Sequence, residues 1–91
     1  MGQSVYERLE WEAREAGRLR HELRSTIHDA SSEARALWVR LEQQLFEIER
    51  RMETVGRTAA TGIVESLERL NRPIRALCAD VRASRELPPV H

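Results

Sequence analysis

Two histidines are the side chains in this sequence whose spacing comes nearest to a metal site. His21-Glu22 matches the first two positions of a zinc-protease motif, but Ser25 stands where that motif needs its second His. His21 and His28 lie seven residues apart, whereas two ligands on one helix face need a spacing of three or four. No Glu precedes a His by three residues, which removes the di-iron bundle pattern. We predict no metal site and no cofactor.

The single cysteine, Cys78, is the next candidate for chemistry. It cannot form an internal disulfide, and it follows Leu77 on an apolar stripe with no His nearby in sequence. This favours a half-buried structural thiol, with a reactive thiol as the alternative. The Ser and Asp residues are framed by no nucleophile elbow and no glycine loop. We therefore predict no catalytic residue and no enzyme.

An arginine cluster near the C-terminus is a candidate binding surface. Arg72, Arg75 and Arg82 share one side of a predicted helix, and Arg69 and Arg85 lie close by. Residues 66–91 hold five Arg against three carboxylates, which is a local charge of +2. A solvated face is the simpler interpretation, and contact with a phosphate or an acidic partner is the alternative.

The elements that must position these residues are long amphipathic helices. Apolar residues follow each other at steps of four, three, four, three, four in two stretches, which is a heptad pattern that another helix must cover. The first stripe comprises Leu41, Leu45, Ile48, Met52, Val55 and Ala59, and the second comprises Ile63, Leu67, Leu70, Ile74, Leu77 and Val81. An earlier stripe through Leu9, Ala16, Leu23 and Ala30 is thinner, and Glu12 falls where an apolar residue would complete it.

We predict an all-α single domain over residues 1–91, either a helical hairpin or a three-helix bundle with coiled-coil-like packing. The first helix covers about 4–28, where Ser4 and Glu7 form a capping box. The second covers 32–56, and the third covers 61–86 with a kink near Pro73 or a new helix capped by Asn71. Residues 87–91 form a tail.

Two segments leave alternatives open. Residues 28–32 contain Asp and Ser, which favours a turn between two antiparallel helices over one continuous helix with a stutter. Residues 54–62 contain two Gly and three Thr, which indicates a loop, or else a helix against which a partner packs closely.

The two tryptophans are candidate contact residues. Trp38 lies on the second helix, one heptad before Leu45, and we expect it at the assembly surface with the two heptad stripes. Trp11 lies about 200° from the stripe of its own helix. An exposed Trp is either a ring lying flat across Arg and Glu stems or a contact with another chain.

Composition excludes several functions. The chain is 41% hydrophobic and 33% charged with a net charge of zero, and every basic residue is Arg. Net neutrality argues against nucleic-acid binding and against an electrostatic membrane anchor. With no signal peptide, no membrane-spanning run and one Cys, we expect a cytoplasmic location.

These observations predict a helical protein–protein interaction module, such as a scaffold, an adaptor or a small accessory subunit. We expect it to self-associate as a dimer or tetramer, or to bind another helical protein, and we expect no small-molecule substrate. One alternative is an amphipathic protein that coats a lipid or polymer surface. Another is a regulator that contacts nucleic acid through its C-terminal Arg face.

Overall fold

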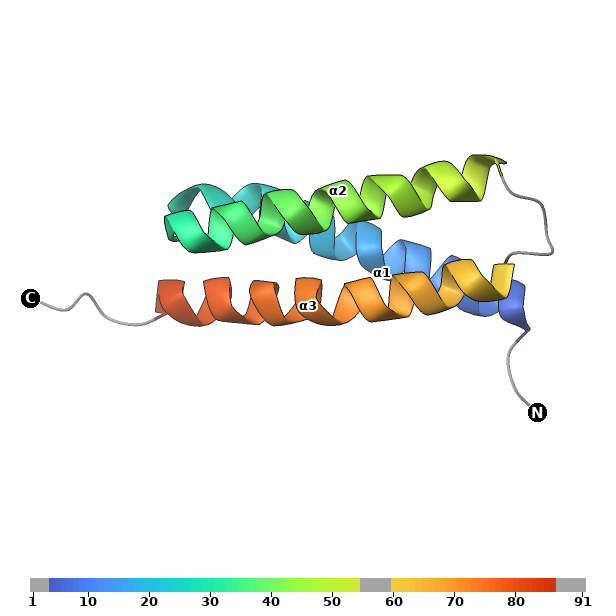
Figure 1. Ribbon diagram of the computed structural model, residues 1–91. Helices are drawn as coiled ribbons and strands as arrows, with labels where there is room; N and C mark the ends of the chain where they lie inside the picture. The colour runs from blue at the N-terminus through green and yellow to red at the C-terminus, as the bar shows by residue number, and fades with distance from the viewer. Residues whose placement is uncertain (1–3, 55–59, 87–91) are drawn as a thin grey trace, which may run out of the picture.

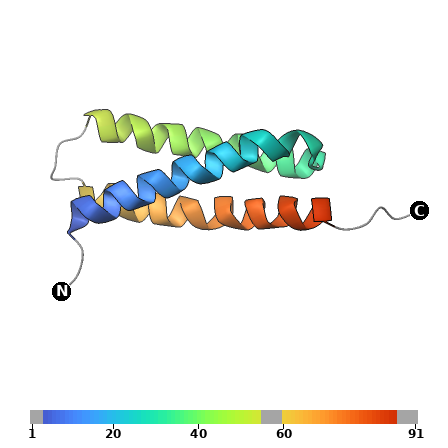
Figure 2. The same cartoon turned by 180° about the vertical axis from the view of Figure 1, so that it is seen from behind.

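The computed structural model describes residues 4–54 and 60–86, which form three α-helices. Helix α1 spans Val5–Thr26, α2 spans Ser32–Thr54 and α3 spans Ala60–Glu86, and a short 3₁₀ turn at Ile27–Asp29 follows α1. The helices α1 and α3 run in one direction and α2 runs in the opposite direction (Figure 1). Seen from behind, α1 crosses in front of the other two helices (Figure 2). The described residues contain no strand, so the predictions of an all-α chain and a helix bundle are confirmed.

Serine side chains cap the first two helices. The hydroxyl of Ser4 accepts a hydrogen bond from the backbone amide of Glu7 at 3.2 Å. The hydroxyl of Ser31 accepts one from the amide of Ala34 at 3.1 Å. Each serine thereby satisfies one of the first amides of its helix, which have no carbonyl partner in the preceding turn.

The chain reverses direction between α1 and α2 through a tight turn. At the end of α1, the hydroxyls of Ser25 and Thr26 both donate to the carbonyl oxygen of Glu22, at 2.8 and 2.9 Å. Side-chain bonds of this kind compete with continued helix. The 3₁₀ turn follows, and Ala30 then adopts an extended conformation with φ −83° and ψ 168°. Of the two sequence alternatives for residues 28–32, the structure therefore has the turn, and a single continuous helix is excluded.

Helix α3 passes through Pro73 without a break. Asn71, which the sequence offered as the cap of a new helix, lies inside α3 instead. Residues 55–59 and 87–91 lie outside the described residues, so the alternatives for residues 54–62 stay predictions over most of that segment. Ala60, Thr61 and Gly62 belong to the first turn of α3.

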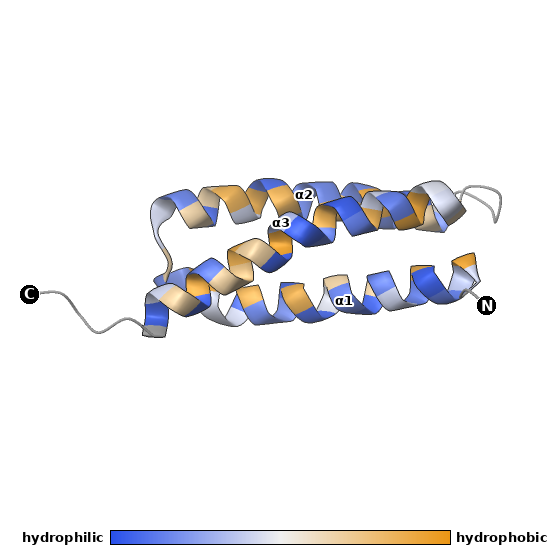
Figure 3. Ribbon diagram, turned by 90° about the horizontal axis from the view of Figure 1, so that it is seen from below, coloured by the Kyte–Doolittle hydropathy of each residue, from blue (hydrophilic) through white to orange (hydrophobic). Residues whose placement is uncertain are grey.

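Helix α3 is covered on two sides, by α1 and by α2. Three pairs of consecutive residues are buried along it, each one heptad after the last, and they are Ile63–Val64, Leu70–Asn71 and Leu77–Cys78. Leu67, Ile74 and Val81, which follow the three pairs in turn, are buried as well. A stripe of three positions per heptad is too wide for one neighbouring helix, so it requires two. Apolar residues gather on the sides of the helices that face one another (Figure 3).

Two adjacent residues of α2 give a direct test of this packing. Leu45 is 1% exposed in the core, whereas Phe46 is 45% exposed. We expect Leu45→Ala to lower the free energy of unfolding by about 2–5 kcal/mol, because it leaves a cavity. The matched variant Phe46→Ala should lower the free energy of unfolding by less than about half as much. Urea denaturation followed by circular dichroism measures both, and equal losses would contradict the observed orientation of α2.

Candidate interaction surfaces

The two candidate histidines lie apart from any metal-ligand cluster of the described residues. His21 on α1 and His28 in the 3₁₀ turn are both exposed. Within residues 4–54 and 60–86, no group of three His, Cys, Asp or Glu side chains could hold a metal ion. No helix in this part of the chain is long and apolar enough to cross a membrane.

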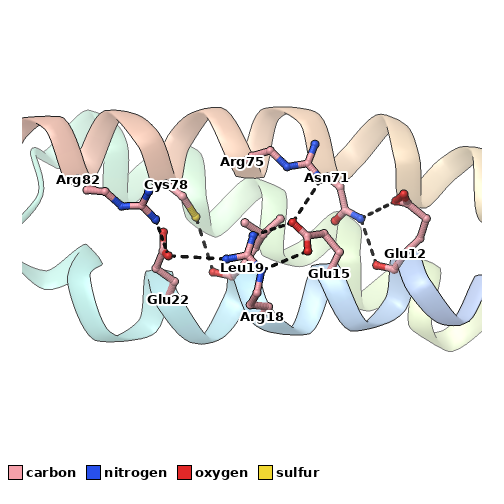
Figure 4. A network of polar contacts seen from close by, with 9 residues as sticks. All are labelled: Glu12, Glu15, Arg18, Leu19, Glu22, Asn71, Arg75, Cys78 and Arg82. Carbon is pink, nitrogen blue, oxygen red and sulfur yellow. Dashed lines mark hydrogen bonds and ion pairs between the residues drawn. The ribbon is translucent and has the colours of Figure 1, made fainter.

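Polar contacts join α1 to α3 along one edge of their interface (Figure 4). Each contact links a residue of α1 to one that lies 59 or 60 positions later in α3. A constant offset is the mark of two parallel helices in a fixed register. The contacts are Arg8 with Glu68, Glu12 with Asn71, Glu15 with Arg75, Leu19 with Cys78 and Glu22 with Arg82. We call this row the polar ladder.

Glu12 and Asn71 are the pair of polar side chains that lies buried in the polar ladder. The Asn71 side-chain amide donates to the Glu12 backbone oxygen at 3.2 Å and to its carboxylate at 2.9 Å. Asn71 is 1% exposed, and its own side-chain oxygen has no hydrogen-bond partner among the described residues. The sequence contained a signal for this pair, because Glu12 interrupts the apolar stripe of α1, but nothing in the sequence pointed to Asn71 as its partner.

Glu15 is held by two arginines. Arg18 donates to its two carboxylate oxygens at 3.2 and 2.7 Å, and Arg75 donates from α3 at 3.3 Å. The hydrogen bond from Arg18 is the main cause that lowers the pKa of Glu15 below its ordinary value, and Arg75 adds to it, while partial burial opposes both.

The predicted Arg face of α3 is divided by the fold. Arg75 pairs with Glu15 and Arg82 pairs with Glu22 at 2.7 Å, so α1 of the same chain supplies acidic partners for both. Arg72 is exposed and lies outside the polar ladder. The three arginines therefore do not form one uniform, unpartnered basic surface.

Cys78 lies in the α1–α3 interface rather than at a reactive surface. Its thiol donates to the backbone oxygen of Leu19 at 3.8 Å, and the residue is buried. Burial, followed by the hydrogen bond and negative charge of Glu22, raises the pKa of the thiol from 9.0 to about 12. Little thiolate is present at neutral pH, so the environment is that of a structural cysteine.

Arginines of α1 also bridge to α2. Arg20 donates to the carboxylate of Glu49 at 2.6 Å, and its guanidinium lies 4.9 Å from the centre of the Phe46 ring. Glu42 lies 3.9 Å from Arg20 and 3.5 Å from Arg24. These contacts, together with the polar ladder, make α1 the helix that carries the interhelical ion pairs.

Most residues predicted at the assembly surface lie inside the single chain. Those buried between the helices are Trp38, Leu41, Leu45, Ile48, Ile63, Leu67, Leu70, Ile74, Leu77 and Val81. Met52 is partly buried against this core. Val55 and Ala59 lie outside the described residues. The heptad stripes thus cover one another within one chain, and no second copy is needed to bury them.

The outer surface holds three of the four aromatic residues. Tyr6 is 49% exposed, Trp11 is 54% exposed and Phe46 is 45% exposed, whereas Trp38 is 5% exposed. Trp11 borders a shallow hollow that it shares with Arg8, Glu12 and Glu68. The exposure of Trp11 agrees with its position outside the apolar stripe of α1.

No family model, no curated protein and no solved structure matches this chain.

The buried pair yields a test by substitution. We expect Asn71→Leu to destabilise the fold by about 1–3 kcal/mol, because the Glu12 carboxylate loses its buried donor. Glu12→Leu should likewise destabilise, because the Asn71 amide loses its carboxylate acceptor and keeps only the backbone oxygen of residue 12. The double variant Glu12→Leu/Asn71→Leu should recover most of either loss, because two apolar side chains need no partner. Urea denaturation measures all three, and additive losses would contradict a coupled pair.

The thiol yields a second test. At neutral pH we expect a disulfide reagent to label Cys78 in the folded protein at least about a hundredfold more slowly than in urea. Because the folded pKa is raised, the thiol's contribution to stability is present below pH 9 and is lost as pH rises from 9.0 towards about 12. A Cys78→Ala control should lack this loss. Equal labelling rates in the folded and unfolded protein would contradict the burial.

Proposed function

We propose that this chain is a non-enzymatic helical interaction module, acting as a scaffold, an adaptor or a small accessory subunit. The observation that carries the proposal is the exposure of Tyr6, Trp11 and Phe46 on a bundle whose inner stripes are already covered. Aromatic side chains are enriched at the energetic centres of protein interfaces. A folded bundle that leaves three of its four aromatic residues about half exposed has apolar surface suited to a partner.

Trp11 is the strongest single candidate for a contact residue. It borders a shallow hollow with Arg8, Glu12 and Glu68, and Arg8 forms an ion pair with Glu68 there. A Trp next to an Arg and a shallow recess is a combination typical of interface hot spots. The partner that suits it is a helix of another protein or of a second copy. Self-association, which the sequence predicts, then uses outer surfaces of the bundle rather than the heptad stripes.

The observed packing gives less support to the two other functions. A protein that coats lipid or polymer would have to open the bundle, because its apolar faces are buried against one another. A nucleic-acid contact through the Arg face would have to displace Arg75 and Arg82 from the carboxylates of α1.

The proposal predicts complexes that depend on the exposed aromatic residues. We expect Trp11→Ala and Phe46→Ala to remain helical by circular dichroism and to lose the complexes with other proteins that the wild-type chain forms in chemical cross-linking of its source extract. Arg14→Ala, an exposed change on the same helix as Trp11, is the matched control and should retain them. A wild-type chain that forms no complex, alone or in its source extract, would contradict the proposed function.

A further inference from the structure

The helices α2 and α3 share an outer face on the side away from α1, which is the side that Figure 1 shows. Successive residues of a helix point 100° apart, so residues at alternating steps of three and four share one side of the helix, and one such row of each helix lies on this face. On α3 they are Gly62, Ser66, Arg69, Pro73, Ala76 and Asp80, and on α2 they are Glu33, Leu37, Arg40, Gln44, Glu47 and Arg51. We call this surface the α2–α3 face.

Two shallow hollows lie on the α2–α3 face, one towards each end. The first is next to the α1–α2 turn, where Ala34, Leu77 and Val81 form an apolar floor below Glu33 and Asp80. The second has Ile48 and Leu70 as its apolar floor, and Glu47, Arg51, Arg69 and Pro73 surround it. Their volumes of about 310 and 290 Å³ are at the small end of the range for small-molecule sites, so each suits a side chain of a partner.

The ion pairs that the described residues form between helices lie on the two sides of the bundle that include α1. Among the described residues, every recorded interhelical ion pair includes an arginine or glutamate of α1, and none joins α2 to α3. In the same part of the chain, Glu33, Arg69 and Asp80 have no recorded ion-pair partner. The two ends also differ in charge, since Glu33 and Asp80 make one end acidic, whereas Arg51 and Arg69 outnumber Glu47 at the other.

We propose that the α2–α3 face binds a second copy of the chain about a twofold axis perpendicular to the helices. Such an axis reverses the helix direction, so the acidic end of each copy meets the basic end of the other. Asp80 then lies against Arg69 of the second copy, and Arg69 lies against its Asp80. This inference rests on the self-association included in the proposed function, and it specifies the surface that is used.

On α3, the centre of this arrangement is occupied by small residues. The midpoint between positions 69 and 80 falls between Pro73 and Ala76, which lie on the same side of α3 and are both exposed. Small side chains there allow the two α3 helices to approach closely. Pro73 also has no backbone N–H, so the carbonyl of Arg69 lacks its usual helical donor and can accept a hydrogen bond from the second copy.

The charges of α2 fit the same axis. Leu37 of α2 lies with Leu77 of α3 at one hollow, and Ile48 of α2 lies with Leu70 of α3 at the other. These two pairs give the register of the antiparallel helices. With this register, the axis passes near Leu41 on α2. Glu33 is then about level with Arg51 of the second copy, so the charge pattern of α2 is complementary in the same sense as that of α3.

The size of the face indicates a weak dimer. At 1.5 Å per residue, α2 and α3 are about 35 and 40 Å long, and two helices about 10 Å wide present roughly 700 Å² per copy. Standard stable interfaces bury about 800 Å² per partner. We therefore expect dissociation in the micromolar range, of the order of 10 μM.

A charge-swap experiment tests the proposal. Sedimentation equilibrium from about 1 to 500 μM measures the molar mass, starting from 10.6 kDa for one chain. We expect Asp80→Arg and Arg69→Asp each to raise the dimer dissociation constant at least tenfold, because like charges meet twice across the axis. An equimolar mixture of the two variants should form a heterodimer, and the double variant Arg69→Asp/Asp80→Arg should dimerise like the wild type. Glu53→Arg, with the same charge change at an exposed position of α2 on the side facing α1, is the control and should not alter dimerisation.

The outcomes separate this inference from the proposed function. A wild-type dimer that neither single variant weakens, or that Trp11→Ala dissociates instead, overturns the α2–α3 face and leaves self-association standing. A wild-type chain that stays at 10.6 kDa throughout the range overturns both the face and the self-association. Circular dichroism on each variant shows whether the exposed substitutions preserve the bundle. Recovery of dimerisation by the mixture or by the double variant excludes unfolding as the cause of the single-variant losses.

Discussion

The rest of the structure depends on the width of the apolar stripe on α3. A helix with three buried positions per heptad cannot satisfy that surface with one neighbour, so α1 must cover one side and α2 the other. The consecutive buried residues Leu70 and Asn71 show the division. Leu70 belongs to the α2 side, where it lies with Ile48 in one hollow, and Asn71 contacts Glu12 of α1. Because the turn after α1 is short and α2 runs antiparallel to α1, one chain places a helix on each side of α3.

Apolar burial and polar contacts have different roles in this bundle. Burial of leucine and isoleucine side chains supplies most of the stabilisation, whereas exposed ion pairs such as Arg82 with Glu22 contribute roughly 0–1 kcal/mol each. The buried contact of Glu12 with Asn71 adds little net energy but is costly to break. A shift of α1 by one turn along α3 would leave both groups unpaired. The polar ladder therefore fixes the register of the two parallel helices, which the apolar residues alone would specify only loosely.

The distribution of ion pairs determines which surfaces remain for partners. The recorded pairs place α1 in salt bridges with both other helices, and Trp11 and Phe46 stay exposed beside them. The α2–α3 face has charges of opposite sign at its two ends. In the function proposed above, the exposed aromatic residues bind a partner and the α2–α3 face binds a second copy, which is the combination that a scaffold or an adaptor requires.

The sequence by itself determined the helical class, the heptad stripes and the capping serine at Ser4, because these depend on local spacing and on hydrogen bonds within one turn. It also indicated that Trp11 points away from the core and that Glu12 interrupts a stripe. It did not determine which stripes meet, because a heptad stripe on one helix is equally well covered by the same chain or by another. Only the tertiary structure decided that the stripes of Leu45 and Ile74 close on each other within one chain. Only the packed helices paired Arg75 with Glu15 and Asn71 with Glu12, since contacts 59 or 60 residues apart follow from the register of two helices and not from the spacing within either.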